Sequence, residues 1–307
     1  MMRRGAFIVA LFFTAGIACG GTLSDSTVFG AKDVRGAFMT RGMGARPVGM
    51  GEAFTAVADD ASAVSWNPGG LSRFKKPAAV VMYDAAGEGM GFSYLAGAMP
   101  VGPVVAGAGL TMASLGSYVK RDEVGTKLGE ESISDMAVVL SCASPHSGFG
   151  LGEAGSGVSL ELVREGLTGE SLLGLSVGTI LARDENLRIG AALQHLGPSK
   201  DGFSLPAAFR VGGMYRFIPN VSGAVDAGYG LVDGQVMAAL GIEASLHPMF
   251  ALRAGYKWLS EDIGVDGLTG VTAGLGARLG DFGLDYAYQP FGELVTSHKV
   301  ALTYNPR

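Results

Sequence analysis

Residues 252–258 read Leu-Arg-Ala-Gly-Tyr-Lys-Trp, and apolar and polar residues alternate along this stretch. The apolar positions are Leu252, Ala254, Tyr256 and Trp258, and the positions between them are Arg253, Gly255 and Lys257. Successive side chains of a β-strand point to opposite faces, so this spacing predicts a strand with one apolar and one polar face.

The same period of two recurs through the C-terminal half of the chain. It is found in residues 173–182, 187–194, 209–217, 240–246, 271–279 and 282–288. One face of each segment is apolar, and the other carries glycine, small polar or charged residues. A transmembrane barrel needs this pattern because its outer face meets lipid and its inner face meets water or a plug. A soluble β-sandwich produces the same alternation with the apolar face turned inward.

Strand length and aromatic placement favour the membrane barrel. Several segments approach the roughly 9–11 residues that a tilted membrane strand requires. Aromatic residues such as Tyr215, Phe217 and Tyr288 stand near segment ends, where a barrel carries its interfacial girdles. We therefore expect an all-β fold, a transmembrane antiparallel β-barrel of about fourteen strands between Pro77 and Tyr304.

Two kinds of connection separate the expected strands. Short turn signals occur at residues 184–186, 219–220, 233–234 and 247–248. Longer polar segments, which we expect to be loops on the opposite rim, are Lys120–Glu131, Pro198–Gly202 and Ser260–Gly267. An outer-membrane barrel alternates short turns with longer loops in this way.

The uncharged stretch Gly89–Val119 is long enough to contain a transmembrane helix. Pro100 and Pro103 interrupt its centre, where each proline would cost a helix about 3 kcal/mol. Its apolar residues also alternate on both sides of the prolines, so we expect two strands joined by a Pro-Val-Gly-Pro turn.

The N-terminus has the pattern of a signal peptide in residues 1–20. Arg3 and Arg4 precede the apolar stretch Ala6–Ala18, which is too short to span a bilayer. Cys19 leaves open the alternative that the chain is lipidated there. We expect export to a Gram-negative outer membrane, with membrane lipid as a partner.

The composition excludes some classes of protein. Charged residues make up 17% of the chain, against roughly 25% in a typical soluble domain. The net charge is −5 and no basic patch is present, so we expect no binding to nucleic acid.

The segment Gly44–Leu71 lacks strand alternation but is too apolar for a solvated tail. We expect short helices packed inside or beneath the barrel, as a plug within an N-terminal extension that spans residues 21–76 ahead of a barrel in 77–307. Trp66 is the expected anchor, because an aromatic side chain buries about 150–250 Å². Asn67 and Pro68 should cap and begin a helical turn, and Asp59 and Asp60 should hold the preceding turn by accepting backbone N–H bonds.

This segment also resembles a known family. The run Met50–Leu71, MGEAFTAVADDASAVSWNPGGL, is similar to the N-terminal signature of PorV/PorQ-type proteins, relatives of the FadL long-chain fatty-acid transporter. That signature reads roughly GMGgAftAvADDasAvywNPAGLa, so Gly69 stands where alanine is usual. Leu284–Leu294 and residues 205–216 also resemble the family.

The resemblance implies two roles. FadL-like proteins pass hydrophobic molecules through a plugged barrel, and PorV acts in type IX secretion as a shuttle for cargo. Hydrophobic small molecules or secreted protein cargo are therefore the implied partners. The alternative function from another class is an exported soluble or lipid-anchored β-sandwich that serves as a binding module.

No motif in the sequence predicts catalysis, a cofactor or a metal. Gly174–Gly178 matches the G-x-S-x-G nucleophile motif, but Ser176 lies within a strand pattern and not at a strand-to-helix turn. Gly150–Gly155 matches G-x-G-x-x-G without a following helix. The four histidines are scattered, and capping is favoured over cation binding for Asp59 and Asp60.

Charged residues on the polar face of the strands should point into the lumen. They are Arg188, Arg210, Arg216, Glu243, Arg253, Lys257, Arg278 and Asp285. They could line a polar path, or they could pair with one another and with the plug.

Overall fold

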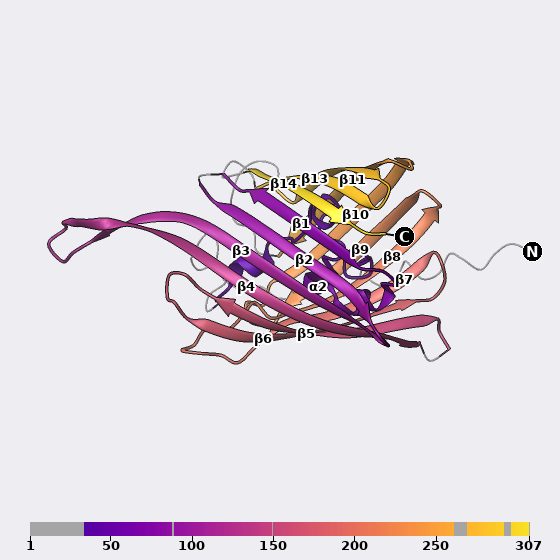
Figure 1. The fold of residues 1–307 in the computed structure, drawn as a ribbon, viewed down its shortest axis with the longest axis horizontal. Coiled ribbons are helices and arrows are strands. Elements are labelled where there is room, and N and C mark those ends of the chain that lie inside the picture. Colours follow the sequence, from indigo (N-terminus) through magenta and orange to yellow (C-terminus); the bar gives the residue numbers. More distant parts are fainter. Residues whose placement is uncertain (1–33, 88, 149, 261–268, 292–295, 307) are drawn as a thin grey trace, which may run out of the picture.

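The computed structural model describes residues 34–87, 89–148, 150–260, 269–291 and 296–306. The expected signal peptide and Cys19 lie outside these residues. Fourteen antiparallel strands form a closed barrel in which the first strand is hydrogen-bonded to the last (Figure 1). The prediction of a closed barrel of about fourteen strands is confirmed, and the β-sandwich alternative is wrong because a single sheet closes on itself.

Each strand pairs with its neighbours in the sequence. The strands are β1 (Ala78–Ala85), β2 (Gly91–Val101), β3 (Val104–Arg121), β4 (Lys127–Ser147), β5 (Glu153–Arg164), β6 (Ser171–Ala182), β7 (Leu187–Leu196), β8 (Ala208–Ile218), β9 (Val221–Gly230), β10 (Val236–His247), β11 (Phe250–Leu259), β12 (Val271–Leu279), β13 (Phe282–Pro290) and β14 (Thr296–Tyr304). The expected turn between Pro100 and Pro103 joins β2 to β3, and the helix alternative there is wrong. In the described part of the chain, no helix is long and apolar enough to cross a membrane.

The strands turn their apolar face outward. Leu275 is 54% exposed and Leu284 is 53% exposed, whereas Asp285 is 5% exposed on the inner face. The outward placement of these leucines confirms the faces predicted from the alternation. An apolar outer band over a polar lumen is what a barrel in lipid requires.

The two rims of the barrel differ. One rim carries the short turns and the chain end near Asn305, and the other carries the longer connections. The hairpin of β3 and β4 projects far beyond the barrel, on the side opposite the C-terminus (Figure 1).

Two expectations about connections are corrected. Lys120–Glu131 is mostly a β-ribbon, since β3 runs to Arg121 and β4 starts at Lys127. The turn at Asp233-Gly234 lies on the rim of the longer connections, because it joins β9 to β10.

The chain before β1 folds inside the barrel. It forms η2 (Ala37–Thr40), α1 (Ala45–Gly49), α2 (Ala63–Trp66) and η3 (Pro68–Arg73), and we call residues 34–76 the plug. Val48, Phe54 and Leu71 are completely buried in it. The plug packs so closely on the wall that a Cβ at Gly69 would lie 2.7 Å from the Cα of Thr179. This close approach explains glycine at a position where the resembling family usually has alanine.

Candidate functional site

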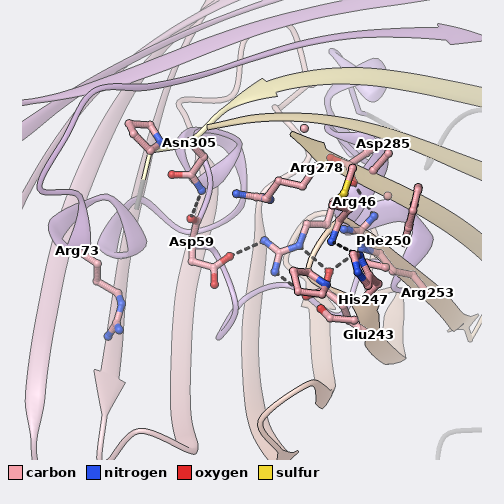
Figure 2. Close-up of a pocket in the computed structure, with 18 of the residues that line it drawn as sticks. Arg46, Asp59, Arg73, Glu243, His247, Phe250, Arg253, Arg278, Asp285 and Asn305 are labelled. Carbon is pink, nitrogen blue, oxygen red and sulfur yellow. Dashed lines mark hydrogen bonds and ion pairs between the residues drawn. The ribbon is translucent and has the colours of Figure 1, made fainter. Parts of the chain in front are cut away.

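Arg46 is the centre of an ion-pair network between the plug and the barrel. Its guanidinium donates two hydrogen bonds to Glu243, from Nε at 2.8 Å and from Nη2 at 3.0 Å. Its Nη1 donates to Asp59 at 2.5 Å and to Asp60 at 3.3 Å. Figure 2 shows Arg46 between Asp59 of the plug and Glu243 of the wall. Bidentate pairing with a carboxylate fixes the position of a guanidinium as well as its charge.

The adjacent carboxylates Asp59 and Asp60 have different environments. Burial raises the pKa of Asp59, but the guanidinium groups of Arg46 and Arg188 lower it by a larger amount. The net pKa of Asp59 is therefore below its ordinary value. Burial raises the pKa of Asp60, and Arg46 offsets this only in part.

The two carboxylates also differ in what they bind. Asp60 accepts the backbone N–H of Ser62 at 2.9 Å, so it holds the turn as predicted. Asp59 pairs with arginines instead of backbone N–H groups, and that part of the prediction is wrong. Among the described residues no group of three potential ligands could hold a metal ion.

A second set of contacts ties the middle of the plug to strands β8, β9 and β11. Lys257 donates to Glu52 at 2.6 Å, and Arg210 donates to the Glu52 carbonyl at 2.7 Å. The Asp226 carboxylate accepts the backbone N–H groups of Phe54 at 3.0 Å and of Thr55 at 2.9 Å. Our sequence analysis did not single out Arg46, Glu52 or Asp226.

Trp66 and Asn67 join the plug to the wall through backbone carbonyls. Trp66 is 4% exposed and its indole N–H donates to the Met43 carbonyl at 2.7 Å. The Asn67 amide donates to the carbonyls of Thr55 at 2.8 Å and of Thr179 at 3.1 Å. Its oxygen accepts the N–H of Gly69 at 3.0 Å, and Pro68 starts η3, so the expected cap and first helical position are both present.

The structure places the eight charged residues expected in the lumen on the inner side of their strands. Arg188, Arg210, Glu243, Arg253, Lys257 and Asp285 form ion pairs there. Arg278 lines a cavity at the turn rim, and Arg216 is half-buried. The wall residues therefore pair both with one another, as Arg253 does with Glu243 and Asp285, and with the plug. Whether they guide a solute remains a prediction.

Ser176 of the G-x-S-x-G match lies mid-strand in β6, beside Glu161 and His195. Its hydroxyl donates to Glu161 at 2.5 Å and accepts the backbone N–H of His195 at 2.9 Å. The His195 ring contacts the other oxygen of Glu161 at 2.8 Å. A nucleophile needs the ring nitrogen of its base on the hydroxyl, so this arrangement is a buried carboxylate bridge between strands.

Two cavities adjoin the plug. The larger, of about 430 Å³, opens at the turn rim around the Arg46 network (Figure 2). The smaller, of about 120 Å³, lies near the other rim between the plug and strands β7–β11. Its apolar lining includes Met39, Met43, Trp66, Met237 and Leu259.

The contacts of Glu52 predict that acid loosens the plug. Burial alone raises the pKa of Glu52, but the Lys257 ammonium outweighs it, so the net pKa lies below the ordinary 4.5. A carboxyl group whose pKa is lower in the folded state stabilises that state above its ordinary pKa, and the contribution disappears as the pH falls through the folded value. Asp59 acts in the same direction, and Asp60 acts in the opposite one.

We therefore expect Trp66 fluorescence, in a Trp258→Phe background, to report increasing exposure as the pH falls below about 4. Glu52→Gln should make this change smaller and should weaken the plug at neutral pH. An identical acid profile in the two proteins would contradict the assignment to Glu52.

Comparisons with known proteins show similarity of fold. No family model matches the sequence, and no curated protein matches it. The toluene transporter TodX of Pseudomonas putida superposes with a TM-score of 0.58 at 14% identity, over 86% of this chain and 97% of TodX. A FadL homologue of Pseudomonas aeruginosa gives a TM-score of 0.58 at 11% identity, over 86% of this chain and 98% of that one.

The monoaromatic hydrocarbon channel CymD gives a TM-score of 0.53 at 12% identity, over 85% of this chain and 96% of CymD. These similarities extend over nearly the whole length of each of the three proteins. The chain therefore has the barrel fold of FadL-like outer-membrane proteins.

Proposed function

We propose that this protein is an outer-membrane channel for small hydrophobic molecules. Residues 1–20 would direct export, residues 21–76 would supply the N-terminal extension with its plug, and residues 77–307 would form the barrel. The observation that carries the proposal is the smaller cavity between plug and wall. Solved structures with this fold include a toluene transporter and a monoaromatic hydrocarbon channel, which supports the same class of solute.

The size of this cavity and the apolar part of its lining suit a small apolar molecule, and charged residues such as Arg41, Glu52 and Lys257 form the rest of the lining. Its volume is about 120 Å³, and an apolar cavity of about 150 Å³ is large enough to bind benzene. The sulfur-containing side chains of Met39, Met43 and Met237 adapt to different shapes and contact aromatic rings favourably. Arg210 and Gln194 also line the cavity and hold the backbone of the plug.

Filling the cavity tests the proposal directly. Ala208 lines it and is half-buried, so Ala208→Trp should fill it and slow the uptake of an apolar dye by about tenfold. The matched control is Ala238→Trp, which adds the same side chain on the outer face of β10. Equal uptake by both variants, with both barrels assembled, would contradict passage through this cavity.

Asn67 distinguishes a fixed plug from a moving gate. Asn67→Ala removes the amide that binds the buried carbonyls of Thr55 and Thr179, and an unpaired buried polar group costs about 1–3 kcal/mol. We expect a lower melting temperature and normal assembly, tested beside Trp66→Ala. Altered dye uptake by an assembled variant would indicate a gate, and loss of assembly would indicate a structural plug. Wild-type behaviour of both variants, with free proteolysis of the native plug, would contradict a packed plug.

The projecting hairpin favours a second candidate, a PorV-type component of type IX secretion. Beyond Ser114 and Met136, β3 and β4 pair only with each other, and Tyr118 and Leu128 are exposed on the ribbon. Open strand edges are suited to pairing with another chain. Deleting residues 117–132 should stop cargo export and leave dye uptake unchanged if the protein is a secretion component. Neither candidate function predicts lost dye uptake with unchanged cargo export. Unchanged cargo export after the deletion would contradict the secretion function.

A further inference from the structure

The larger cavity has an unusual position and lining for a channel of hydrophobic molecules. It opens at the turn rim, where it is bordered by the β10–β11 turn at Pro248, by Lys75 before β1 and by Asn305 after β14. Outer-membrane barrels place their short turns in the periplasm, so the cavity would face that compartment. Its volume of about 430 Å³ lies within the roughly 300–1,000 Å³ of small-molecule sites.

Positive charge is in excess in this cavity. Its acidic lining residues are Asp59, Glu243 and Asp285, and its basic lining residues are Arg46, Arg73, Lys75, Lys76, Arg188, Arg253 and Arg278. Seven basic and three acidic groups leave a formal charge of +4. All three carboxylates already bind arginines.

Arg73 and Lys75 are the cations that could serve an external ligand. Both are exposed, and no hydrogen bond or ion pair joins either one to another residue of the described chain. Figure 2 shows Arg73 apart from the Arg46 network, with its guanidinium extended from the plug. Partial burial and the guanidinium of Arg188 lower the pKa of Arg73, and the carboxylates of Asp59 and Glu153 offset this only in part, so two like charges face one region of the cavity.

We propose that this cavity binds a phosphate group between Arg73, Lys75 and Arg188. A planar guanidinium group can donate two parallel hydrogen bonds to two oxygens of a phosphate group, and a phosphate monoester carries about −1.5 to −2 charges at neutral pH. One phosphate monoester would therefore neutralise about half of the excess charge and separate Arg73 from Arg188, and the phosphodiester of a phospholipid, with its single negative charge, would neutralise less. The group could belong to a free periplasmic phosphate compound or to the headgroup of an inner-leaflet phospholipid.

The test uses the full-length barrel in neutral detergent, with inorganic phosphate titrated by calorimetry and acetate as the comparison anion. We expect saturable phosphate binding that Arg73→Gln/Lys75→Gln weakens by about tenfold or more, since both charged donors are lost. The matched control Arg183→Gln/Lys200→Gln removes one arginine and one lysine from exposed positions outside the cavity, and its affinity should be unchanged.

A second experiment distinguishes the two sources of the phosphate group. The barrel is placed in nanodiscs of phosphatidylglycerol or phosphatidylcholine and released, and native mass spectrometry then detects any phospholipid that it retains. Phospholipid retained by the wild type and lost from Arg73→Gln/Lys75→Gln identifies a headgroup, and binding of inorganic phosphate alone identifies a soluble compound. The proposal would be overturned if neither inorganic phosphate nor phospholipid bound to the wild type. It would also be overturned if the cavity and control variants lost the same amount of binding. Dye uptake is measured in parallel and should be unchanged by the cavity variant, so this test stands apart from the proposed channel function.

Discussion

Arg46→Met is expected to release the plug from the wall while the barrel persists. The substitution leaves Glu243, Asp59 and Asp60 without the guanidinium that binds all three. Removing one partner of a buried ion pair costs about 3–5 kcal/mol when the remaining charge is left uncompensated. Asp60 is left in this way, because Arg46 is its ion-pair partner in the described chain, whereas Asp59 keeps Arg188 and Glu243 keeps Arg253. We expect chymotrypsin to cut the variant within residues 41–66 and to leave the wild-type plug intact, with heat-modifiable migration of the barrel retained in both.

A second substitution shows whether charge is the cause. In Arg46→Met/Glu243→Met the carboxylate that accepts two hydrogen bonds from Arg46 is also removed, while Asp59 keeps Arg188 and Arg253 keeps Asp285. The double variant should therefore be more resistant to chymotrypsin than Arg46→Met alone, as expected for residues that interact directly. If the double variant is equally sensitive or more so, Arg46 acts through packing and not through its charge.

The barrel could be predicted from the sequence because the pattern that defines each strand lies within that strand's own residues. In a strand between lipid and a polar lumen, apolar and polar residues must alternate. The outward position of Leu275 and the inward position of Asp285 therefore follow from the residue types alone, without knowledge of the neighbouring strands. The same reasoning failed for the ribbon at Lys120–Glu131. Both faces of this ribbon meet solvent, so no burial imposes a period on its residues, and its polar composition resembles that of a loop.

The contacts of the plug could not be predicted in this way. Arg46 and Glu243 lie 197 positions apart, and the packing of the plug inside the barrel brings them together. Part of the signal was nevertheless present in the sequence. Arg46 and Glu52 are charged residues within or beside a very apolar segment, and a buried charge requires an opposite charge as its partner. Such residues could have been matched with the inward charges of the wall, although not assigned pair by pair.

The outward face of β12 allows a depth-dependent test of the membrane assignment. Leu275 lies at the middle of this nine-residue strand, and Leu279 lies at its end on the same face. They are 54% and 75% exposed, so neither substitution disturbs the packed interior. Lipid-facing arginine costs about 2–4 kcal/mol at the midplane of such a barrel and about 0–1 kcal/mol near the interface.

Leu275→Arg should therefore greatly reduce the amount of heat-modifiable barrel in the outer membrane, whereas Leu279→Arg should remain close to wild type. The measurement is refolding into lipid vesicles, with urea titration of each variant to obtain the free energy of unfolding. A protein in water would tolerate arginine at both exposed positions, because a solvated guanidinium on a surface strand has little cost. Equal and small effects of the two substitutions would therefore refute a lipid-facing β12, and equal and large effects would mean that the apolar band extends to the rim at Leu279.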